Sequence, residues 1–470
     1  LKSLIELKTW ILIWIFITFM QNILRFLIRD ALQFFNISPR NNSQNVVIYG
    51  AGKAGIQLYA SLNITQNYNV LFFVDDNDKL WGKYIYGKQI KSPNEIRKYK
   101  NKVNYILLAI PSLKIRERKY IINSLQKETL KVLQIPSIDE ITQGKVPINR
   151  LRALSIEDLL EREHFVPDQD LSYPAVKNKV ILVTGSGGSI GSEICRQIIR
   201  FKPKTLILLD INEHSLYIIN KHLQEESNCR IIPLLGNATN YSFLKNIFKK
   251  YKVDTVFHAA AYKHVPMVEG NAMQGIYNNV FSTLAICQVA KEKRTDKVVL
   301  ISSDKAVRPT NIMGASKRLA EQVIQSFAEE EKKTNSKFKT KFLMVRFGNV
   351  LGSSGSVVPL FDEQIENGGP LTLTHSEVTR YFMTIKEAAS LVVQSTELAK
   401  GGDLLLLDMG EPIKILDLAK KMIKLKGLTI KNKQNPNGEI EIIEIGLRPG
   451  EKLYEELLID AETETTIHPR

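Results

Sequence analysis

The segment that most restricts the fold is a glycine-rich loop between an apolar run and a helix-like run. It reads KVILVTGSGGSIGSEICRQII over residues 179–199. Thr184, Gly185, Gly188 and Gly191 follow the spacing T-G-x-x-G-x-x-G, in which glycines let the backbone turn tightly and approach a phosphate at a helix N-terminus. The next apolar run, TLILLD, ends in Asp210, where a carboxylate can accept hydrogen bonds from the adenosine ribose hydroxyls. These features predict a dinucleotide-binding unit.

The same carboxylate indicates which dinucleotide is bound. Asp210 would repel a 2′-phosphate, and the following DINEHS offers no arginine to accommodate one, so we favour NAD over NADP. The residues predicted to contact this cofactor are Thr184, Gly185, Gly188, Ser189, Ile190, Gly191, Asp210, Asn237, Ala238, Ala259, Ala260, Ala261 and Lys317.

Further apolar runs alternate with helix-like segments, at 230–237, 255–261, 297–303 and 341–350. This alternation predicts an α/β fold with a doubly wound parallel sheet and ligands at the carboxyl ends of its strands. A weaker signal lies upstream, where Gly50, Gly52 and Gly55 of NVVIYGAGKAGIQLYASL have G-x-G-x-x-G spacing and LFFVDD places Asp75 about 20 residues on. It predicts a small Rossmann-like nucleotide-binding domain, and the alternative is a domain of the same fold that binds nothing or a regulatory nucleotide.

The N-terminus is strongly apolar. TWILIWIFITFMQNIL, residues 9–24, has sixteen uncharged residues and predicts a membrane helix, with an interfacial amphipathic helix as the alternative. The domain prediction is a membrane anchor at 1–35, a Rossmann-like domain at 36–145, a linker at 146–175 and a catalytic domain at 176–470. We expect the anchor to be the end of a longer membrane region in the cytoplasmic membrane, with the catalytic domain in the cytoplasm.

Charge and cysteine content exclude other classes. The net charge of +15 is scattered rather than gathered in an aromatic-interleaved basic motif, so no nucleic-acid partner is predicted. The three cysteines are far apart, which argues for a reducing compartment, and no metal-ligand spacing of His and Cys is present.

A second motif, SSDKAVRPTNIMGASKR at 302–318, carries the candidate catalytic residues. Ser303, Asp304 and Lys305 follow an apolar strand and should lie in the ligand crevice. Lys317 occupies the position of the lysine that grips a nicotinamide ribose, but the residue four before it is Met313, where a proton-carrying tyrosine is usual.

With these motifs the chain resembles the extended short-chain dehydrogenase/reductase superfamily. More narrowly, it resembles the membrane-anchored nucleotide-sugar 4,6-dehydratases of bacterial polysaccharide and glycan biosynthesis. The specific motifs are TGSGGSIGSEICRQI, HAAAYKHVPMVE, SSDKAVRPTNIMGASKR, GSVVPLFDEQIENGGPLTLT, TRYFMT and LRPGEKLYEEL. In that family methionine likewise occupies the tyrosine position, so Met313 fits the resemblance.

The resemblance implies a three-step reaction. Hydride leaves sugar C4 for NAD⁺, water is eliminated across C5 and C6, and the hydride returns to C6. It makes Lys305 the candidate base at C5 and Asp304 the candidate acid at the C6 hydroxyl, with Ser303 hydrogen-bonding the C4 oxygen. We expect desolvation and nearby positive charge to lower the pKa of Lys305.

The resemblance also assigns the substrate side. Arg448 and Lys452 flank a Pro-Gly turn that suits a pyrophosphate. The full set of predicted substrate contacts is Lys263, His264, Asn279, Asn349, Arg380, Arg448 and Lys452. His264 is as readily structural, and Asn279 and Asn349 are as readily loop caps.

The predicted activity is NAD-dependent 4,6-dehydration of a UDP-sugar, with UDP-N-acetylglucosamine and a homo-oligomer implied by the resemblance alone. Two alternatives stay open. One is a nucleotide-sugar 4-epimerase, which would want the missing tyrosine. The other is a catalytically silent, membrane-bound NAD sensor. The sugar, the C5 stereochemistry and the proton acceptor for the C4 hydroxyl are not determined by the sequence.

Overall fold

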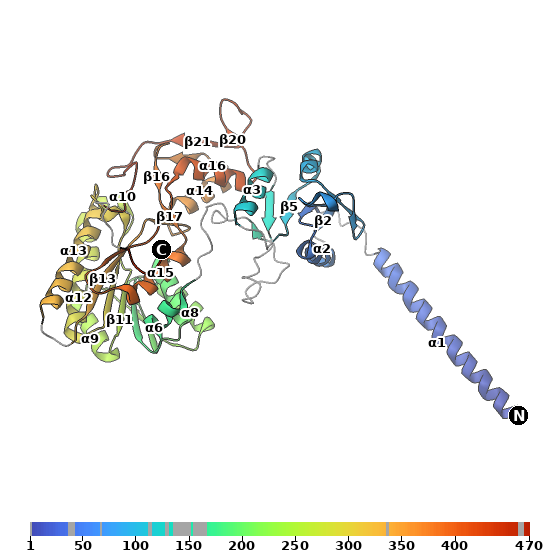
Figure 1. Cartoon of the computed structure of the whole chain (residues 1–470), viewed down its shortest axis with the longest axis horizontal. Helices are drawn as coiled ribbons and strands as arrows, with labels where there is room; N and C mark the ends of the chain where they lie inside the picture. The colour runs from blue at the N-terminus through green and yellow to red at the C-terminus, as the bar shows by residue number, and fades with distance from the viewer. Residues whose placement is uncertain are drawn as a thin grey trace. The chain divides into compact units, whose positions relative to one another are not determined.

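The computed structural model describes residues 2–35, 43–65, 68–110, 115–126, 131–134, 152–153, 167–334, 338–458 and 465–470. The chain forms two compact units, Leu1–Leu154 and Ser155–Arg470 (Figure 1). The predicted linker, 146–175, overlaps both units. Within it, residues 152–153 pair in the sheet of the first unit, and α6 (Gln169–Val176) packs on α15 (Ile385–Leu398) of the second.

The first unit begins with a long helix, α1 (Lys2–Phe35). Large apolar side chains along it, including Trp10, Trp14 and Phe16, are exposed. In the described ranges no helix is long and apolar enough to cross a membrane, so the structure does not support the predicted spanning segment.

The rest of the first unit is a small α/β domain. Its sheet has the order β3-β4-β2-β1-β5-β6-β7, parallel in the centre and antiparallel at the β3–β4 and β6–β7 edges. Its strands are β1 (Gln44–Tyr49), β2 (Tyr68–Val74), β3 (Tyr84–Ile85), β4 (Lys88–Lys91), β5 (Tyr105–Leu108), β6 (Lys131–Gln134) and β7 (Arg152–Ala153). Its helices are α2 (Lys53–Thr65), α3 (Ile115–Gln126) and the 3₁₀ turns η1 (Asp78–Leu80) and η2 (Pro93–Lys102). The predicted Rossmann-like arrangement is therefore present around the upstream glycine loop.

The second unit is built on a seven-stranded sheet whose described neighbours are all parallel, in the order β10-β9-β8-β11-β12-β13-β18. The strands are β8 (Val180–Thr184), β9 (Thr205–Asp210), β10 (Arg230–Leu235), β11 (Thr255–His258), β12 (Lys297–Ile301), β13 (Lys341–Arg346) and β18 (Leu404–Leu406). The chain order reverses between β8 and β11, which is where parallel sheets of this kind bind ligands. The predicted doubly wound parallel fold is confirmed.

Helices cover both faces of this sheet because successive strand residues point to opposite sides. Ile181, Val183 and Leu208 pack with α6, α7 and α15 in one core, whereas Leu182 and Leu209 pack with α9, α12 and α13 in the other. The helices are α7 (Ser189–Ile199), α8 (Glu213–Glu226), α9 (Tyr241–Tyr251), α10 (Val265–Glu269), α11 (Ala272–Ile276), α12 (Ser282–Lys293), α13 (Ile312–Lys333), the π turn η3 (Tyr277–Phe281) and the 3₁₀ turn η4 (Asp304–Ala306).

The C-terminal part of the second unit contributes a smaller subdomain. Its sheets pair β15-β21-β20, β14-β17 and β16-β19. The elements are β14 (Asn349–Val350), α14 (Val357–Glu366), β15 (Leu371–Leu373), β16 (Thr379–Arg380), β17 (Phe382–Met383), β19 (Ile413–Lys414), α16 (Ile415–Leu425), β20 (Ile430–Lys431) and β21 (Ile440–Glu444). In Figure 1 these elements lie beyond one end of the main sheet.

Candidate active site

A cavity of about 960 Å³ lies in the second unit, where four strands of the main sheet end. Gly185, Ala259, Ser302 and Phe347 line it, each within a residue of the end of β8, β11, β12 or β13. The smaller subdomain supplies the other wall through β15, β16 and the turn at 448–455. The cavity thus joins the predicted cofactor loop to the predicted substrate residues.

The glycine loop is built so that its backbone, rather than side chains, faces the cavity. Gly185 has φ +66°, and a Cβ there would lie 2.7 Å from the backbone nitrogen of Ala260. A Cβ at Gly191 would lie 2.0 Å from the carbonyl oxygen of Gly185, so α7 approaches the loop at a distance that only glycine permits. Gly188 caps α7 without a side-chain hydrogen bond, which leaves the first helical N–H groups able to meet a phosphate.

Asp210 holds this loop from the end of β9. Its Oδ2 accepts a 2.8 Å hydrogen bond from the backbone N–H of Gly187, and its Oδ1 accepts one of 2.9 Å from Asn212. The first unit repeats this geometry, because Asp75 accepts from the backbone N–H groups of Ala51 and Asn77. In both units the carboxylate after the second strand positions the glycine loop.

A buried histidine, His258, which the sequence did not predict as a site residue, contacts the start of the same loop through Thr184. His258 Nδ1 lies 2.7 Å from Thr184 Oγ1, and its Nε2 lies 3.1 Å from Thr283 Oγ1. Burial, reinforced by the charge of Lys317, lowers the pKa of His258 to about 3, so the ring is neutral. Thr184 is therefore a support for the loop rather than a part of the cavity wall.

The other predicted cofactor residues divide in the same way. The cavity is lined by Gly185, Gly188, Ser189, Ile190, Gly191, Ala259, Ala261 and Lys317. The residues outside its lining are Thr184, Asp210, Asn237, Ala238 and Ala260. Asn237 accepts a hydrogen bond from the backbone of Thr239, and Ala238 belongs to the core, so both shape the neighbouring loop.

Met313 and Lys317 line the cavity one turn apart on α13. The Nζ of Lys317 donates a 2.5 Å hydrogen bond to the carbonyl oxygen of Ile301, at the end of β12. Burial lowers the pKa of Lys317 to about 8, against the opposing effect of Glu321. Lys317 is therefore held at the predicted nicotinamide side, while Met313 supplies only apolar surface.

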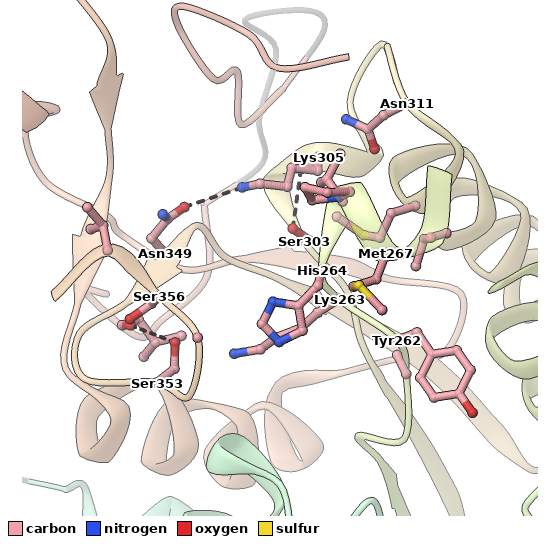
Figure 2. Close-up of a pocket in the computed structure, with 18 of the residues that line it drawn as sticks. Tyr262, Lys263, His264, Met267, Ser303, Lys305, Asn311, Asn349, Ser353 and Ser356 are labelled. Carbon is pink, nitrogen blue, oxygen red and sulfur yellow. Dashed lines mark hydrogen bonds between the residues drawn. The ribbon is translucent and has the colours of Figure 1, made fainter. Parts of the chain in front are cut away.

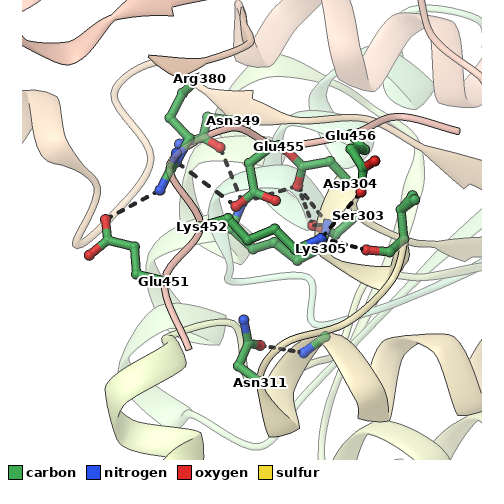
Figure 3. Close-up of polar contacts among 12 residues, drawn as sticks. Ser303, Asp304, Lys305, Asn311, Asn349, Arg380, Glu451, Lys452, Glu455 and Glu456 are labelled. Atoms are coloured by element: carbon green, nitrogen blue, oxygen red, sulfur yellow. Dashed lines mark hydrogen bonds and ion pairs between the residues drawn. The ribbon is translucent and has the colours of Figure 1, made fainter. Parts of the chain in front are cut away.

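Lys305 and Asp304 form a close pair on η4 (Figure 3). Lys305 Nζ lies 3.0 Å from Asp304 Oδ1, which also accepts hydrogen bonds of 2.9 Å from Ser303 Oγ and from the backbone of Lys305. Lys305 Nζ also donates to Asn349 Oδ1 at 3.3 Å, as Figure 2 shows from the cavity side. Ser303 and Lys305 line the cavity, whereas Asp304 is fully buried behind them.

The expectation that the pKa of Lys305 is lowered is wrong for this structure. Burial does lower it, but the adjacent carboxylates of Asp304 and Glu455 more than compensate, and the net effect raises the pKa of Lys305 above its ordinary value. Lys305 is thus a cation at rest. Because an ion pair and a neutral pair hold the same number of protons, transfer to a neighbouring carboxylate can still give a neutral amine.

Glu455 is a second carboxylate that the sequence reasoning missed. It lines the cavity, is 8% exposed, and places Oε1 3.6 Å from Lys305 Nζ and 3.9 Å from Arg380 Nε. It belongs to the motif LRPGEKLYEEL, in which the sequence predicts substrate contacts only for the two cations Arg448 and Lys452. No feature of the sequence distinguishes Glu455 from Glu451 and Glu456 in the same motif.

The predicted substrate residues separate into two groups. Lys263, His264, Asn349, Arg380 and Arg448 line the cavity. Burial lowers the pKa of Lys263, and burial together with the charge of Lys263 lowers that of His264. Figure 2 shows Lys263 and His264 on the same side of the cavity.

Asn279 and Lys452 lie outside the cavity lining. The side-chain amide of Asn279 is buried, accepts from the backbone N–H of Tyr262 and donates to Ser316 Oγ, so it ties two segments together. Lys452 donates a 3.0 Å hydrogen bond to the carbonyl of Val307 and lies 3.6 Å from Glu456. Both residues serve local structure here.

The parallel sheet, the glycine loop and the cavity at the strand ends form a Rossmann-like α/β fold of the kind found in short-chain dehydrogenase/reductases. Residues 181–470 match the family described as "Polysaccharide biosynthesis protein", and residues 42–133 match "C2185-like, N-terminal". The chain belongs to the polysaccharide biosynthesis protein family.

Three relatives illustrate that membership. "Capsular polysaccharide biosynthesis protein CapD" of Staphylococcus aureus is 41% identical over 97% of this chain and 75% of its own length. "Probable polysaccharide biosynthesis protein EpsC" of Bacillus subtilis (strain 168) is 41% identical over 88% of this chain and 68% of its own. A "UDP-glucose 4-epimerase" of Rickettsia bellii is 33% identical over 61% of this chain and 79% of its own.

Solved structures agree with the fold. "Pen" from Bacillus thuringiensis has a TM-score of 0.54 at 35% identity, covering 60% of this chain and 84% of its own. The dTDP-glucose 4,6-dehydratase DesIV from Streptomyces venezuelae, with NAD and TYD bound, has a TM-score of 0.51 at 19% identity over 59% of this chain and 88% of its own. The latter similarity supports the fold alone.

Proposed function

We propose that the protein is an NAD-dependent nucleotide-sugar 4,6-dehydratase acting on UDP-N-acetylglucosamine. The observation that carries the proposal is the pairing of Lys305 with carboxylates at the cavity, beside an α13 that has Met313 where a tyrosine acid–base would stand. An elimination needs a base and an acid at the sugar. A 4-epimerase only oxidises and re-reduces C4, so it does not require a lysine–carboxylate pair beside C5 and C6.

The chain's residues fit NAD. A phosphate can come close to the backbone at Gly185 and Gly188, because both residues face the cavity and neither has a Cβ. Asp210 at the end of β9 suits a ribose diol, and Lys317 reaches the cavity from α13. When bound, NAD⁺ would supply a hydride acceptor that later returns the hydride.

The reacting sugar would lie between Lys305 and the glycine loop. Ser303 and Asn349, which line the cavity on either side of Lys305, can hydrogen-bond sugar hydroxyls. Lys305, once neutral, would take the C5 proton, which is acidic because it neighbours a C4 ketone. Arg380 and Arg448, on the wall that the smaller subdomain supplies, carry the charge that a nucleoside diphosphate needs.

Product analysis tests the proposal. The purified protein is incubated with NAD⁺ and, separately, UDP-N-acetylglucosamine, UDP-glucose and UDP-N-acetylgalactosamine, and the nucleotide sugars are separated by liquid chromatography, which resolves C4 epimers, before mass spectrometry. We expect loss of one water from UDP-N-acetylglucosamine with no net accumulation of NADH. An isomer of unchanged mass would indicate the epimerase alternative, and no change with any sugar would indicate a silent NAD-binding protein.

A membrane association through α1 belongs to the proposal, supported by the exposed apolar side chains of Trp10, Leu12 and Trp14. Vesicles of phosphatidylglycerol and phosphatidylethanolamine should shift the tryptophan emission to the blue. An unchanged spectrum would contradict the association.

Self-association is proposed as well. Met273, Tyr277 and Phe281 recur every four residues along α11 and η3 and are about half exposed or more, which gives an apolar stripe. Sedimentation velocity should show a species larger than 53.4 kDa, and a monomer at all concentrations would contradict it.

A further inference from the structure

Asp304 is poorly placed to give a proton to a sugar. Its side chain is completely buried and is absent from the residues that line the cavity. Its Oδ1 already accepts hydrogen bonds from Ser303 Oγ, Lys305 N and Lys305 Nζ. Its Oδ2 faces Gly348, where a Cβ would lie 3.1 Å away, and has no hydrogen-bond partner among the described residues. Lys305 stands between this carboxylate and the cavity.

Glu455, unlike Asp304, lies at the cavity wall, where a carboxylate can reach a bound sugar. It lines the cavity on the far side of Lys305 and reaches it from the turn that follows β21. Figure 3 shows its carboxylate within the group formed by Arg380, Asp304 and Lys305. Its Oε1 faces Lys305 Nζ at 3.6 Å, while Oε2 is buried and has no hydrogen-bond partner in the described part of the chain. A buried, unpartnered carboxylate oxygen at a cavity wall is costly unless a ligand or a proton satisfies it.

We infer that Glu455 is the general acid that protonates the departing C6 hydroxyl, and that Asp304 serves to hold and balance Lys305. The inference rests on the proposed 4,6-dehydratase function and assigns one of its steps to a residue outside the Asp304–Lys305 pair.

Over one reaction cycle, every proton that Lys305 and Glu455 give up is replaced. Transfer of one proton from Lys305 to Glu455 gives a neutral amine and a carboxylic acid without any change in total protons. In the elimination the C5–H bond breaks and its proton goes to Lys305. The C5–H electrons form the C5–C6 double bond, and the C6–O bond breaks as Glu455 gives its proton to the leaving oxygen, which departs as water. Lys305 later returns its proton to C5, and the proton released from the C4 hydroxyl replaces the one that Glu455 lost.

The surroundings favour this charge change. After elimination Lys305 is a cation beside two carboxylates, and Glu455 is an anion 3.9 Å from Arg380 Nε. Arg380 is kept in place by Glu451, whose Oε1 lies 3.2 Å from its Nη2. Groups arranged to meet the developing charges stabilise the transition state more than the starting state.

The test compares two leaving groups in the full-length protein. The variant Glu455→Gln is assayed with UDP-N-acetylglucosamine and with its analogue carrying fluorine in place of the C6 hydroxyl, because fluoride departs without a proton. The glutamine cannot accept the Lys305 proton, but loss of the Glu455 charge also removes an interaction that raises the pKa of Lys305, so burial favours the neutral amine directly. With the natural sugar we therefore expect water loss to fall roughly 100-fold or more while C5 exchange with deuterated water persists. With the fluoro sugar, fluoride release should return to within about tenfold of wild type.

Two variants control the comparison. Glu387→Gln removes a buried carboxylate that pairs with Arg470 at 2.8 Å, outside the cavity lining, and should leave both reactions unchanged. Asp304→Asn should slow both C5 exchange and elimination with either leaving group, since it disturbs Lys305 itself. Unimpaired water loss in Glu455→Gln, or rescue by fluoride in Asp304→Asn instead, would overturn the assignment. If wild-type protein itself forms no dehydrated product, the proposed function fails and the role of Glu455 fails with it.

Discussion

Lys305 Nζ lies 3.0 Å from Asp304 Oδ1, and both residues come from one short turn at the end of β12. The end of β12 therefore places the cation at the cavity wall and its counter-charge directly behind it. In the proposed mechanism this ion pair is the resting state, and the reactive state differs from it by the transfer of one proton from Lys305 to Glu455.

Loss of the amine should stop the reaction without removing the cofactor. Lys305→Met should lower formation of the dehydrated product by roughly 100-fold or more. Among the described residues, no other amine that lines the cavity pairs with both Asp304 and Glu455. Product formation is followed by mass spectrometry and NAD⁺ binding by calorimetry. Lys414→Met, at an exposed lysine paired with Glu377 outside the cavity, is the control and should be fully active. Full activity in Lys305→Met would contradict the mechanism.

A methyl group at Gly191 should disrupt the cofactor loop. In Gly191→Ala the added Cβ would meet the Gly185 carbonyl oxygen at 2.0 Å, and backbone atoms cannot move aside as a flexible side chain could. We expect a loss of about 1–3 kcal/mol in the free energy of unfolding and much weaker NAD⁺ binding. Gly270→Ala, whose Cβ would meet no atom nearer than 3.7 Å, should be neutral in thermal unfolding and in binding. Equal behaviour of the two variants would refute the close-approach argument.

Asp210 should set the preference between the two dinucleotides. Asp210→Ala removes a carboxylate that would repel a 2′-phosphate, and it also frees the N–H of Gly187. The ratio of NAD⁺ to NADP⁺ affinity should therefore fall by roughly tenfold or more in calorimetric titrations. Asp254→Asn alters a carboxylate that accepts from the backbone of Val180 at the opposite end of β8, and its ratio should stay at the wild-type value. A preference unchanged by Asp210→Ala would show that another residue selects the cofactor.

Lys317 should make stability depend on pH in the alkaline range. Burial lowers its pKa to about 8 from the ordinary 10.5, so between these values the folded protein has released a proton that the unfolded chain still holds. The free energy of unfolding contributed by this group therefore rises with pH across that window. Chemical denaturation should show the difference between wild type and Lys317→Met growing in favour of wild type from about pH 8 to 10.5. A constant difference would mean that Lys317 titrates normally.

Much of the fold follows from local sequence. The run TLILLD predicts a strand, and it matches β9. The prediction was reliable because a strand that is buried along its whole length, as β9 is, needs a nearly continuous apolar run. The seventh strand, β18, was not predicted, since only three residues, Leu404–Leu406, form it and all are half-buried. The two-residue strands β14 and β17 carry no periodicity at all and exist because of their pairing with each other.

The site was predictable where a motif is contiguous. Ser303, Lys305, Met313 and Lys317 meet at the cavity because one strand end and the following helix place them there. Glu455 could not be found in this way, because its contact with Lys305 depends on how the C-terminal turn folds back. The direction of the Lys305 pKa shift was mispredicted because Asp304 and Glu455 together raise the pKa against the effect of burial.

Proton NMR of the purified protein with NAD⁺ and UDP-N-acetylglucosamine in deuterated water tests the central claim most directly. The account predicts a new C6 methyl signal together with deuterium at C5. The hydride from C4 returns to C6 and completes the methyl group, while C5, which lost its proton in the elimination, is reprotonated with deuterium exchanged from the solvent. A C4 epimer without a methyl signal, or a spectrum that does not change, would contradict it.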